Sequence, residues 1–376
     1  MSDVTTVDIA IIGAGIAGVG VAAMLSDCKR VILLEAEPQP GYHSTSRSAA
    51  IYIAGYGNAV VRALTRASAS DFERPPAEWT TNALLAERGI LVIAGLDETE
   101  KFAQELAAGE GLRQISVQDA VDLVPILRRE LIDAAAFDIS ARDIDVDALH
   151  QGWLRMIKRQ GGEIATLAPV LAIHRETTGW LIEAGDRRVR AGIVVNAAGA
   201  WADRIGALSG VAPIGLKPLR RSIAVLAAPD GIDATRWPLF GNASETWYVK
   251  PDAGKLLISP ADEDPVEPQD AYADDMVLAE GLDRFERATT YQVTRVERSW
   301  AGLRTFAPDR TPVVGFDCHA SGFFWLAGQG GYGIQTAPAL ARLSAALILG
   351  EVKGLLLDKQ TVARLSPDRF GRSALD

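Results

Sequence analysis

The chain has 376 residues, which is enough for two domains of ordinary size, and its 48% hydrophobic and 23% charged residues predict a globular protein. The net charge of −10 argues against nucleic acid or an anionic membrane as a partner, and the two cysteines provide neither a disulfide framework nor a metal cluster. No apolar run approaches the length of a membrane span, and the first strand begins too early for a signal peptide. We therefore predict a soluble, cytoplasmic protein without a metal, and leave contact with a membrane surface open.

The N-terminal residues predict a dinucleotide-binding βαβ unit. Its parts are an apolar strand over 7–12, the spacing G-x-G-x-x-G at Gly13, Gly15 and Gly18, a helix over 17–25, and a second strand over 31–34 that ends at Glu35. The glycines permit a tight turn and a close approach to a pyrophosphate, and the helix N-terminus offers free N–H groups to phosphates. Glu35 can accept hydrogen bonds from a ribose diol. The unit predicts a cofactor that contains ADP, without distinguishing FAD from NAD.

The rest of the chain alternates between two kinds of pattern. Residues 41–57 are predicted to form a loop that lies on a ligand. In chain order, we then expect helix 59–72, strand 89–94, two helices up to about residue 124, helix 147–160, a ribbon of 170–175, 179–184 and 187–190, strand 193–195, a helix opening at Trp201, an antiparallel sheet within 217–300, helix 276–290, strand 322–328 and helix 334–349.

This order predicts an α/β fold with two interleaved domains. Residues 1–85, 143–215 and 301–376 would form a discontinuous Rossmann-like cofactor domain, and residues 86–142 and 216–300 would form a substrate domain with a mixed or antiparallel sheet. Dehydrogenases that use NAD usually keep a compact nucleotide-binding domain. The interleaving therefore favours FAD.

Several segments resemble the D-amino-acid oxidase family of FAD-dependent oxidoreductases, and within it the D-arginine dehydrogenases. The segments are GAGIAG, GYHSTSRSAA, VNAAGAWAD, KPLRRS, WYVKPDAG, SWAGLRTF and GQGGYGIQT. The resemblance implies an FAD-binding Rossmann-like domain beside a substrate domain with a large mixed sheet. It also implies FAD without a covalent link, and an amino acid as the small-molecule substrate.

For the cofactor, the resemblance implies three groups of contacts. The ADP half would lie against Gly13, Gly15, Ile16, Ala17, Gly18 and Glu35, with Val170 near the adenine. The pyrophosphate and flavin would lie against Arg47, Ser48, Ala49, Gly199 and Trp201, with Arg47 as a counter-charge to phosphate. The flavin would also meet the turn before the last long helix, at Gly330, Gly331, Tyr332, Gly333 and Ile334.

For the substrate, a guanidinium is the natural partner of an α-carboxylate because it offers two parallel hydrogen bonds. Arg220 and Arg221 alternate on a predicted strand, so only one can point at the flavin, and the resemblance selects Arg221. It adds Arg304 and Tyr248 at the carboxylate, and Tyr56 on the active-site loop. Gln335 would contact substrate or flavin, and the Gly331 carbonyl would accept from the amine.

The side-chain pocket departs from the pattern of D-arginine dehydrogenases. The acid expected there to meet a guanidinium aligns with Ile90, and Glu87 is predicted to lie on a turn three residues earlier. Ile51 and Ile53 stand where polar residues are usual. An unpaired guanidinium would lose solvation against these side chains. We therefore expect an apolar or aromatic D-amino acid, or a cyclic secondary amine.

The sequence predicts oxidation of the Cα–N bond of a D-amino acid, giving an imino acid that hydrolyses to a 2-oxo acid and ammonia. Alternatives on the same fold are an oxidase or dehydrogenase for glycine or for a secondary amine such as sarcosine or a proline derivative, and a 2-hydroxy-acid dehydrogenase. A non-catalytic flavoprotein would not need a carboxylate clamp. The electron acceptor (oxygen, a quinone or another carrier) and the oligomeric state stay open.

Overall fold

The N-terminal βαβ unit forms where the sequence predicts it. The computed structural model describes residues 4–108, 110–351 and 356–371, and in this part of the chain the strands form three sheets. β1 (Val4–Ile12) and β2 (Val31–Leu34) pair in parallel, with α1 (Ile16–Leu25) between them in the chain. Most of their side chains are buried, as expected for parallel strands covered on both faces.

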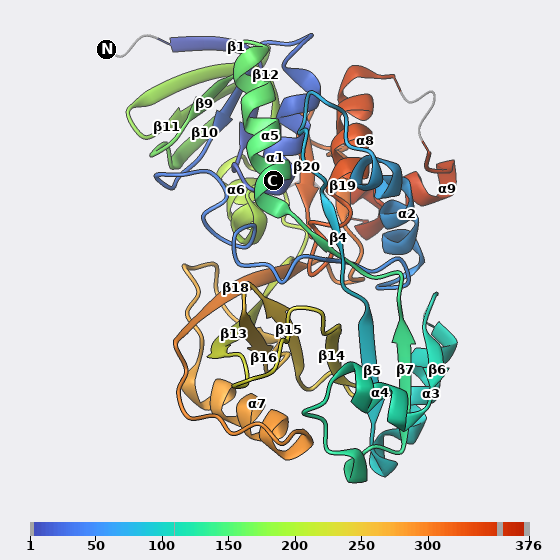
Figure 1. Cartoon of the computed structure of the whole chain (residues 1–376). Helices are drawn as coiled ribbons and strands as arrows, with labels where there is room; N and C mark the ends of the chain where they lie inside the picture. Colours follow the sequence, from blue (N-terminus) through green and yellow to red (C-terminus); the bar gives the residue numbers. More distant parts are fainter. Residues whose placement is uncertain (1–3, 109, 352–355, 372–376) are drawn as a thin grey trace.

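An eight-stranded sheet is built around this unit, in the upper half of Figure 1. Its other strands are β9 (Glu163–Ala165), β10 (Val170–Glu176), β11 (Gly179–Ala184), β12 (Arg187–Asn196), β19 (Val313–Phe316) and β20 (Phe323–Ala327). The order is β10-β11-β12-β1-β2-β9, with β20 pairing β12 and β19. The two strands predicted at 187–190 and 193–195 are one strand, β12. It pairs with β1 from Arg188 to Asn196, with a single gap opposite Asp8. Its first half also pairs with β11, and its last residues with β20.

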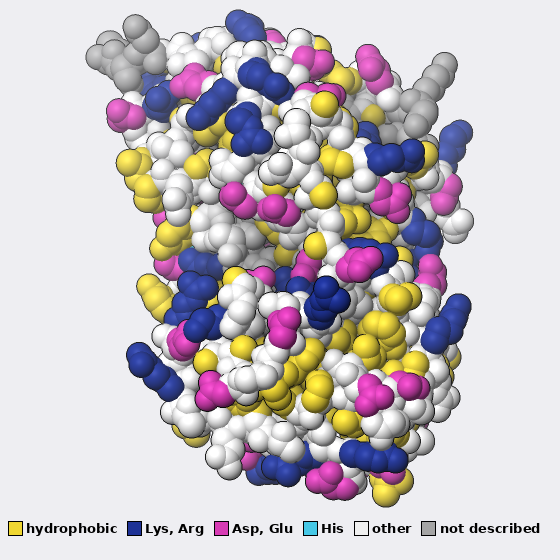
Figure 2. Space-filling model, viewed as in Figure 1, with side chains coloured by type: hydrophobic (Ala, Val, Ile, Leu, Met, Phe, Trp, Pro, Cys, Tyr) yellow, Lys and Arg dark blue, Asp and Glu magenta, His cyan; other side chains and the backbone are white. Residues whose placement is uncertain are grey.

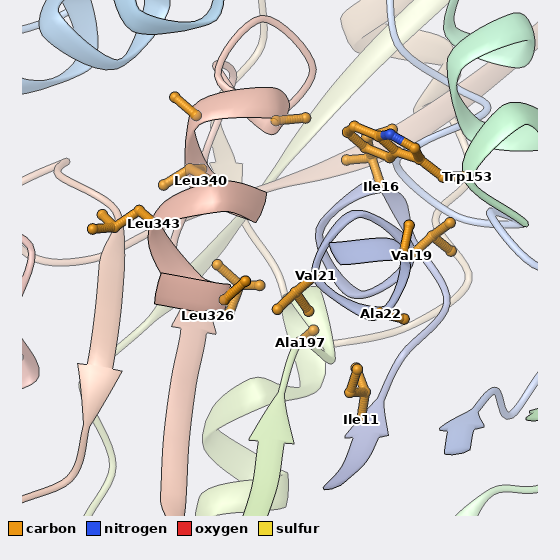
Figure 3. Close-up of a cluster of buried hydrophobic side chains, with 14 of the residues drawn as sticks. Ile11, Ile16, Val19, Val21, Ala22, Trp153, Ala197, Leu326, Leu340 and Leu343 are labelled. Carbon is orange, nitrogen blue, oxygen red and sulfur yellow. The ribbon is translucent and has the colours of Figure 1, made fainter. Parts of the chain in front are cut away.

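Helices cover this sheet and enclose an apolar core. α1, α5 (Val146–Arg159), α6 (Ala202–Leu208) and α8 (Ala337–Leu349) contact its strands. α2 (Ala59–Glu73) packs on α8, and α9 (Lys359–Ala363) follows α8 in the chain. Figure 3 shows Val19 of α1 near Trp153 of α5, and Val21 of α1 near Ala197 and Leu326 of β20. A Cβ at Gly20 would lie 2.9 Å from the Trp153 ring, so this glycine lets α1 and α5 pack closely. The core fixes the helix N-terminus that follows β1.

A nine-stranded sheet occupies the lower half of Figure 1. Its strands are β5 (Ile90–Ala94), β6 (Arg113–Ile115), β7 (Ala134–Asp138), β13 (Lys217–Ala227), β14 (Leu239–Asn242), β15 (Tyr248–Asp252), β16 (Lys255–Ser259), β17 (Asp264–Pro265) and β18 (Arg298–Phe306). Helices α3 (Thr99–Ala108), α4 (Val117–Leu123) and α7 (Asp275–Ala288) pack on it. The antiparallel sheet predicted within 217–300 is joined to β5 by parallel pairing of β14, so the sheet is mixed.

A small sheet of β3 (Ile51–Tyr52), β4 (Leu85–Glu87) and β8 (Arg142–Ile144) lies apart from the two large ones. Glu87 is therefore in a strand and not on the predicted turn, because β4 pairs with β8. Two of the predicted domain boundaries, 142/143 and 300/301, fall inside β8 and β18. The last long helix begins at 337 and not at 334, since Thr336 precedes it as N-cap.

Short 3-10 helices occur at Leu96–Glu98, Arg129–Leu131, Gly199–Trp201 and Pro367–Phe370. Among the described residues, no helix combines the length and apolar character that crossing a bilayer requires. On the face shown in Figure 2, Lys and Arg side chains are interspersed with Asp and Glu side chains over both halves. This face therefore presents no large block of a single charge.

Candidate active site

A cavity of about 440 Å³ lies where β1, β2 and β12 end. The glycine turn after β1 forms one wall, as a dinucleotide requires. Gly13 has φ +100°, and a Cβ there would lie 2.5 Å from the Ala197 carbonyl oxygen. Only glycine fits this turn without displacing the strand beside it. We call this space the first cavity.

The acid at the end of β2 also faces the first cavity. Glu35 is 8% exposed, and its two oxygens accept hydrogen bonds from the backbone N–H of Ala14 (2.8 Å) and Glu37 (3.0 Å). These bonds fix the carboxylate across from the glycine turn, in the place predicted for ribose recognition. Nε2 of the buried His150 donates to the Ala14 carbonyl at 3.0 Å, and burial lowers the pKa of this imidazole.

Most of the predicted cofactor residues line the first cavity. They are Gly13, Gly15, Ile16, Ala17, Glu35, Arg47, Ser48, Ala49, Val170, Gly199, Trp201, Gly330, Gly331, Gly333 and Ile334. Gly18 does not line it, because it packs against the turn at Gly13: a Cβ there would clash with the Gly13 carbonyl oxygen. Tyr332 is also absent from the lining, and its ring packs instead against Tyr56 and Phe306.

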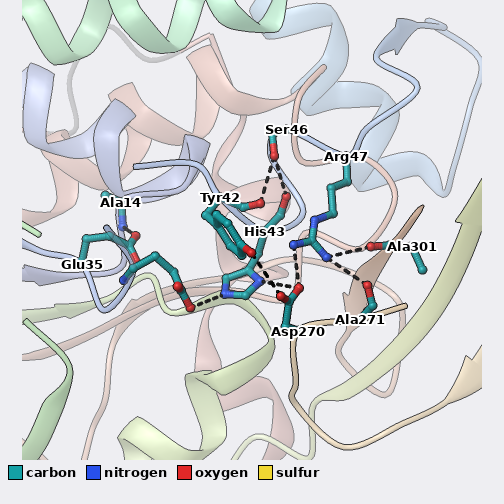
Figure 4. A network of polar contacts seen from close by, with 10 residues as sticks. Ala14, Glu35, Tyr42, His43, Ser46, Arg47, Asp270, Ala271 and Ala301 are labelled. Carbon is teal, nitrogen blue, oxygen red and sulfur yellow. Dashed lines mark hydrogen bonds and ion pairs between the residues drawn. The ribbon is translucent and has the colours of Figure 1, made fainter. Parts of the chain in front are cut away.

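Arg47 lines the first cavity and also has partners that the sequence did not predict. Its guanidinium pairs with Asp270 at 2.6 Å and donates to the carbonyl groups of Ala271 and Ala301 (Figure 4). Its charge is thus paired with an acid from a loop that precedes α7, while the residue still lines the first cavity. Tyr42 donates to the same carboxylate at 3.2 Å. Asp270 therefore ties the loop over the first cavity to the lower half of the molecule.

His43 belongs to the same loop and lines the first cavity. Its Nε2 lies 2.9 Å from Glu37, its Nδ1 lies 3.9 Å from Asp270, and its ring packs on Trp201 at 4.7 Å between centroids. The ring thus has carboxylate and indole neighbours on several sides. It serves as a wall of the cavity.

Three side chains of the nine-stranded sheet meet at the inner end of the first cavity. Arg221 of β13, Tyr248 of β15 and Arg304 of β18 line both this cavity and a second one beside it. Register explains the convergence: Arg304 lies opposite Leu219 and Gly302 lies opposite Arg221, so the two arginines are diagonal neighbours on one face. Arg220 points the other way and pairs with Asp264 at 2.9 Å. The predicted choice of Arg221 over Arg220 agrees with this geometry.

Arg221, Tyr248 and Arg304, which we call the clamp, carry a net positive charge. Arg221 is held by the Asp262 carbonyl (2.8 Å) and by Glu263 (3.3 Å), and Glu263 is shared with Arg310 (2.9 Å). Arg304 makes no ion pair within the described residues. Burial lowers its pKa, but Tyr248, Tyr56 and Glu263 outweigh burial, and the pKa is raised. The site therefore presents more positive than negative charge to a ligand.

The hydroxyl of Tyr248 is buried between the two arginines. Burial alone would raise its pKa, but Arg304 and Arg221 lower it below the ordinary value of 10.0. This oxygen is without a hydrogen-bond partner in the described part of the chain, as are Nε2 of Gln329 and Oγ1 of Thr305. All three residues line the first cavity. Buried polar groups are normally satisfied, so these atoms, together with the glycine turn, fit a bound polar ligand such as a flavin dinucleotide.

The second cavity has a volume of about 200 Å³ and adjoins the clamp. The predicted pocket residues Ile51, Ile53, Ile90 and Gly331 all line it, together with Tyr56 and Gln335. The Arg304 guanidinium lies over Gly331, where a Cβ would be 3.0 Å from Nη1. Burial raises the pKa of Tyr56, which keeps this phenol neutral at the pocket wall.

Both amide atoms of Gln335 hold neighbouring parts of the chain. Its Oε1 accepts from the Ile53 N–H at 3.1 Å, and its Nε2 donates to Thr65 Oγ1 at 3.0 Å. The side chain is 3% exposed. These two bonds position the segment that carries Ile51 and Ile53, and the contact with substrate or flavin stays a prediction.

The second cavity also contains acids that the sequence reasoning missed: Glu105, Glu110, Asp138 and Glu245. Glu110 pairs with Arg66 at 2.9 Å, and Asp138 accepts from Ser140. Burial, and then the charge of Glu245, raise the pKa of Glu105. The residues come from α3, the loop before β6, strand β7 and the loop before β15, so no local motif connects them.

Comparisons with known proteins agree with this geometry. The family model described as FAD dependent oxidoreductase matches residues 8–347. Glycine oxidase of Geobacillus kaustophilus (strain HTA426) is 24% identical over 277 residues, which cover 70% of each chain. Human mitochondrial dimethylglycine dehydrogenase is 23% identical over 272 residues, covering 67% of this chain and 30% of that protein.

A solved structure resembles the whole chain. The crystal structure of L-proline dehydrogenase from P. horikoshii superposes with a TM-score of 0.83 and 22% identity, and covers 100% of both chains. At this identity the likeness concerns the fold. It places the eight-stranded and nine-stranded sheets in an architecture that is known from experiment.

Proposed function

Because this chain belongs to the FAD dependent oxidoreductase family, we propose that it oxidises the Cα–N bond of an amino acid. The observation that carries the proposal is the clamp of Arg221, Tyr248 and Arg304 at the junction of the two cavities. Bound FAD, held without a covalent link, supplies the acceptor for the hydride. The clamp would bind the α-carboxylate and so direct the Cα–H toward the first cavity, where positioning provides most of the rate acceleration.

We further propose a D-amino acid with an apolar or aromatic side chain. Ile51, Ile53 and Ile90 support this choice because they line the pocket beside the clamp. The acids in the pocket do not by themselves call for a basic side chain. Glu110 is already paired with Arg66, and Asp138 accepts from the Ser140 hydroxyl.

The second candidate is a secondary amine or glycine. Its support comes from relatives whose names are glycine oxidase, dimethylglycine dehydrogenase and L-proline dehydrogenase. The same clamp would bind the carboxylate of such a substrate. The pocket of about 200 Å³ is larger than glycine needs, which favours a substrate with a side chain.

Anaerobic reduction of the flavin tests the proposal. The purified holoenzyme is mixed without oxygen with D-amino acids, L-amino acids, sarcosine, proline or 2-hydroxy acids, and the loss of flavin absorbance is followed. We expect apolar and aromatic D-amino acids to bleach the flavin and to yield ammonia and a 2-oxo acid. Bleaching by sarcosine or proline alone supports the second candidate, whereas bleaching only by hydroxy acids refutes both.

Two further points stay predictions. Denaturation by heat is expected to release all the flavin into solution, and flavin that stays with the polypeptide would contradict a non-covalent cofactor. The cytoplasmic location expected from the sequence is to be tested by fractionation of the cells that make the protein. The electron acceptor follows from comparing reoxidation of the reduced enzyme by oxygen and by a quinone.

A further inference from the structure

A buried lysine lies behind residues 49–53, which we call the wall because Ala49 lines both cavities and Ile51 and Ile53 line the second. Lys250 is 5% exposed and lines neither cavity. Its Nζ donates to the Ala49 carbonyl at 2.9 Å, and Ala49 lines both cavities. A charged amine is rarely buried unless it is paired. Here it is paired with two acids and directed at one backbone oxygen.

The acids neutralise the lysine without drawing it away from that oxygen. Asp143 lies 3.2 Å from Nζ and Asp252 lies 3.7 Å from it. The second oxygen of Asp143 accepts two bonds from Arg88, at 2.6 and 2.8 Å. The cluster of Lys250, Asp143, Asp252 and Arg88 is therefore balanced in charge, and Asp143 keeps a partner if the lysine is removed.

The wall segment needs such support because its backbone is strained. Ala50 has φ +52°, a left-handed conformation that costs a residue with a side chain and persists only where the surroundings impose it. The Ala50 carbonyl accepts from the Ile144 N–H at 2.9 Å, and Ile51 pairs with Asp143 in the small sheet. Lys250 thus holds Ala49, and β8 holds Ala50 and Ile51.

The same strand delivers a clamp residue. Tyr248 and Lys250 are two positions apart on β15, so their side chains leave the same face of the sheet. Tyr248 belongs to the clamp, and Lys250 contacts the wall at Ala49, close in the chain to Ile51 and Ile53. β15 thus connects the position of the clamp with the position of the wall.

We propose that Lys250 is a positioning residue that, by holding the Ala49 carbonyl, keeps the wall between cofactor and substrate in its working conformation. The role concerns the chain's own loop, so the effect of Lys250 on FAD binding can be measured without a substrate. The effect on kcat/KM rests on the proposed function. Failure of one readout can therefore be distinguished from failure of the other.

The test compares Lys250→Met with Lys255→Met. Lys255 lies on the neighbouring strand β16, is partly exposed and pairs with Glu297 at 2.7 Å, so its loss removes a lysine of the same sheet without touching the wall. Removing the charge-assisted bond of Lys250 is expected to raise the Kd of the apoprotein for FAD about tenfold. The visible circular dichroism of the bound flavin should change, and kcat/KM should fall. Lys255→Met should match the wild type in all three measurements.

Lys250→Arg, which keeps a charged donor, should recover part of the affinity for FAD and part of the flavin signal. The proposal is overturned if Lys250→Met binds FAD with wild-type affinity and an unchanged circular dichroism. It is equally overturned if Lys250→Met only lowers the melting temperature of the apoprotein, with the flavin signal and kcat/KM of the folded enzyme intact. That result would make the lysine merely structural.

Discussion

Arg221→Met is expected to separate binding of the substrate from stability of the fold. In the structure the Arg221 guanidinium donates to the Asp262 carbonyl and pairs with Glu263. Glu263 keeps two bonds from Arg310 when Arg221 is gone, so no buried acid is left alone. Loss of the remaining bond to the carbonyl should cost about 1 kcal/mol of the free energy of unfolding.

The substrate loses more than the fold does. A hydrogen bond to a charged group is worth about 1.5–3 kcal/mol, and about 1.4 kcal/mol corresponds to a factor of ten. Loss of the carboxylate contact should thus lower kcat/KM for the best amino-acid substrate about 10²-fold. The effect is measured as the rate of anaerobic flavin reduction over a range of substrate concentrations, with the melting temperature recorded for each variant.

Arg220→Met is the matched control. This neighbour lies on the other face of β13, pairs with Asp264 and lines neither cavity. Its kcat/KM should stay near that of the wild type. Equal losses in the two variants, or an unchanged kcat/KM for Arg221→Met, would refute the assignment of the clamp.

Three other substitutions test separate parts of the site. Asp270→Asn removes the charge that holds Arg47, and because this acid is partly exposed we expect only about a threefold rise in the Kd for FAD, measured by fluorescence titration. Burial lowers the pKa of His150 below 6.5, so the unfolded chain takes up this proton first and stability is lost as the pH falls from about 6.5. His150→Gln should flatten that slope in melting curves of the apoprotein, and an unchanged slope would assign it to other groups. Ile90→Glu should raise kcat/KM for D-arginine relative to apolar D-amino acids, and no change would show that Ile90 does not meet the substrate side chain.

The parts of the fold that depend on local pattern could be predicted. β1, α1 and β2 follow from an apolar run, a glycine spacing and a second apolar run that are adjacent in the chain. The parallel pairing of β14 with β5 could not be predicted, since these strands lie about 150 residues apart and neither carries a mark of its partner. The joining of 187–190 and 193–195 into β12 was missed for the same reason, because the pairing with β1 decides it.

The candidate site shows the same division. Alternation separates Arg220 from Arg221, and the structure has this alternation. The pairing of Arg47 could not be predicted, because nothing in its own segment reveals Asp270, the acid that pairs with it from a distant loop. Glu105 and Glu245 enter the second cavity from segments that no motif connects. Their presence depends on how α3 and the loop before β15 pack.

The arrangement of β1, β12 and β20 has a consequence for biosynthesis. These three adjacent strands come from early, central and late parts of this chain, and the turn at Gly330 follows the last of them. A growing chain therefore cannot complete the sheet until β20 has left the ribosome. The same holds for the part of the first cavity that Gly330 and Gly331 line. Contacts so distant in sequence also slow folding. Because FAD stabilises only the completed site, cofactor uptake would act as the final step that selects fully synthesised molecules.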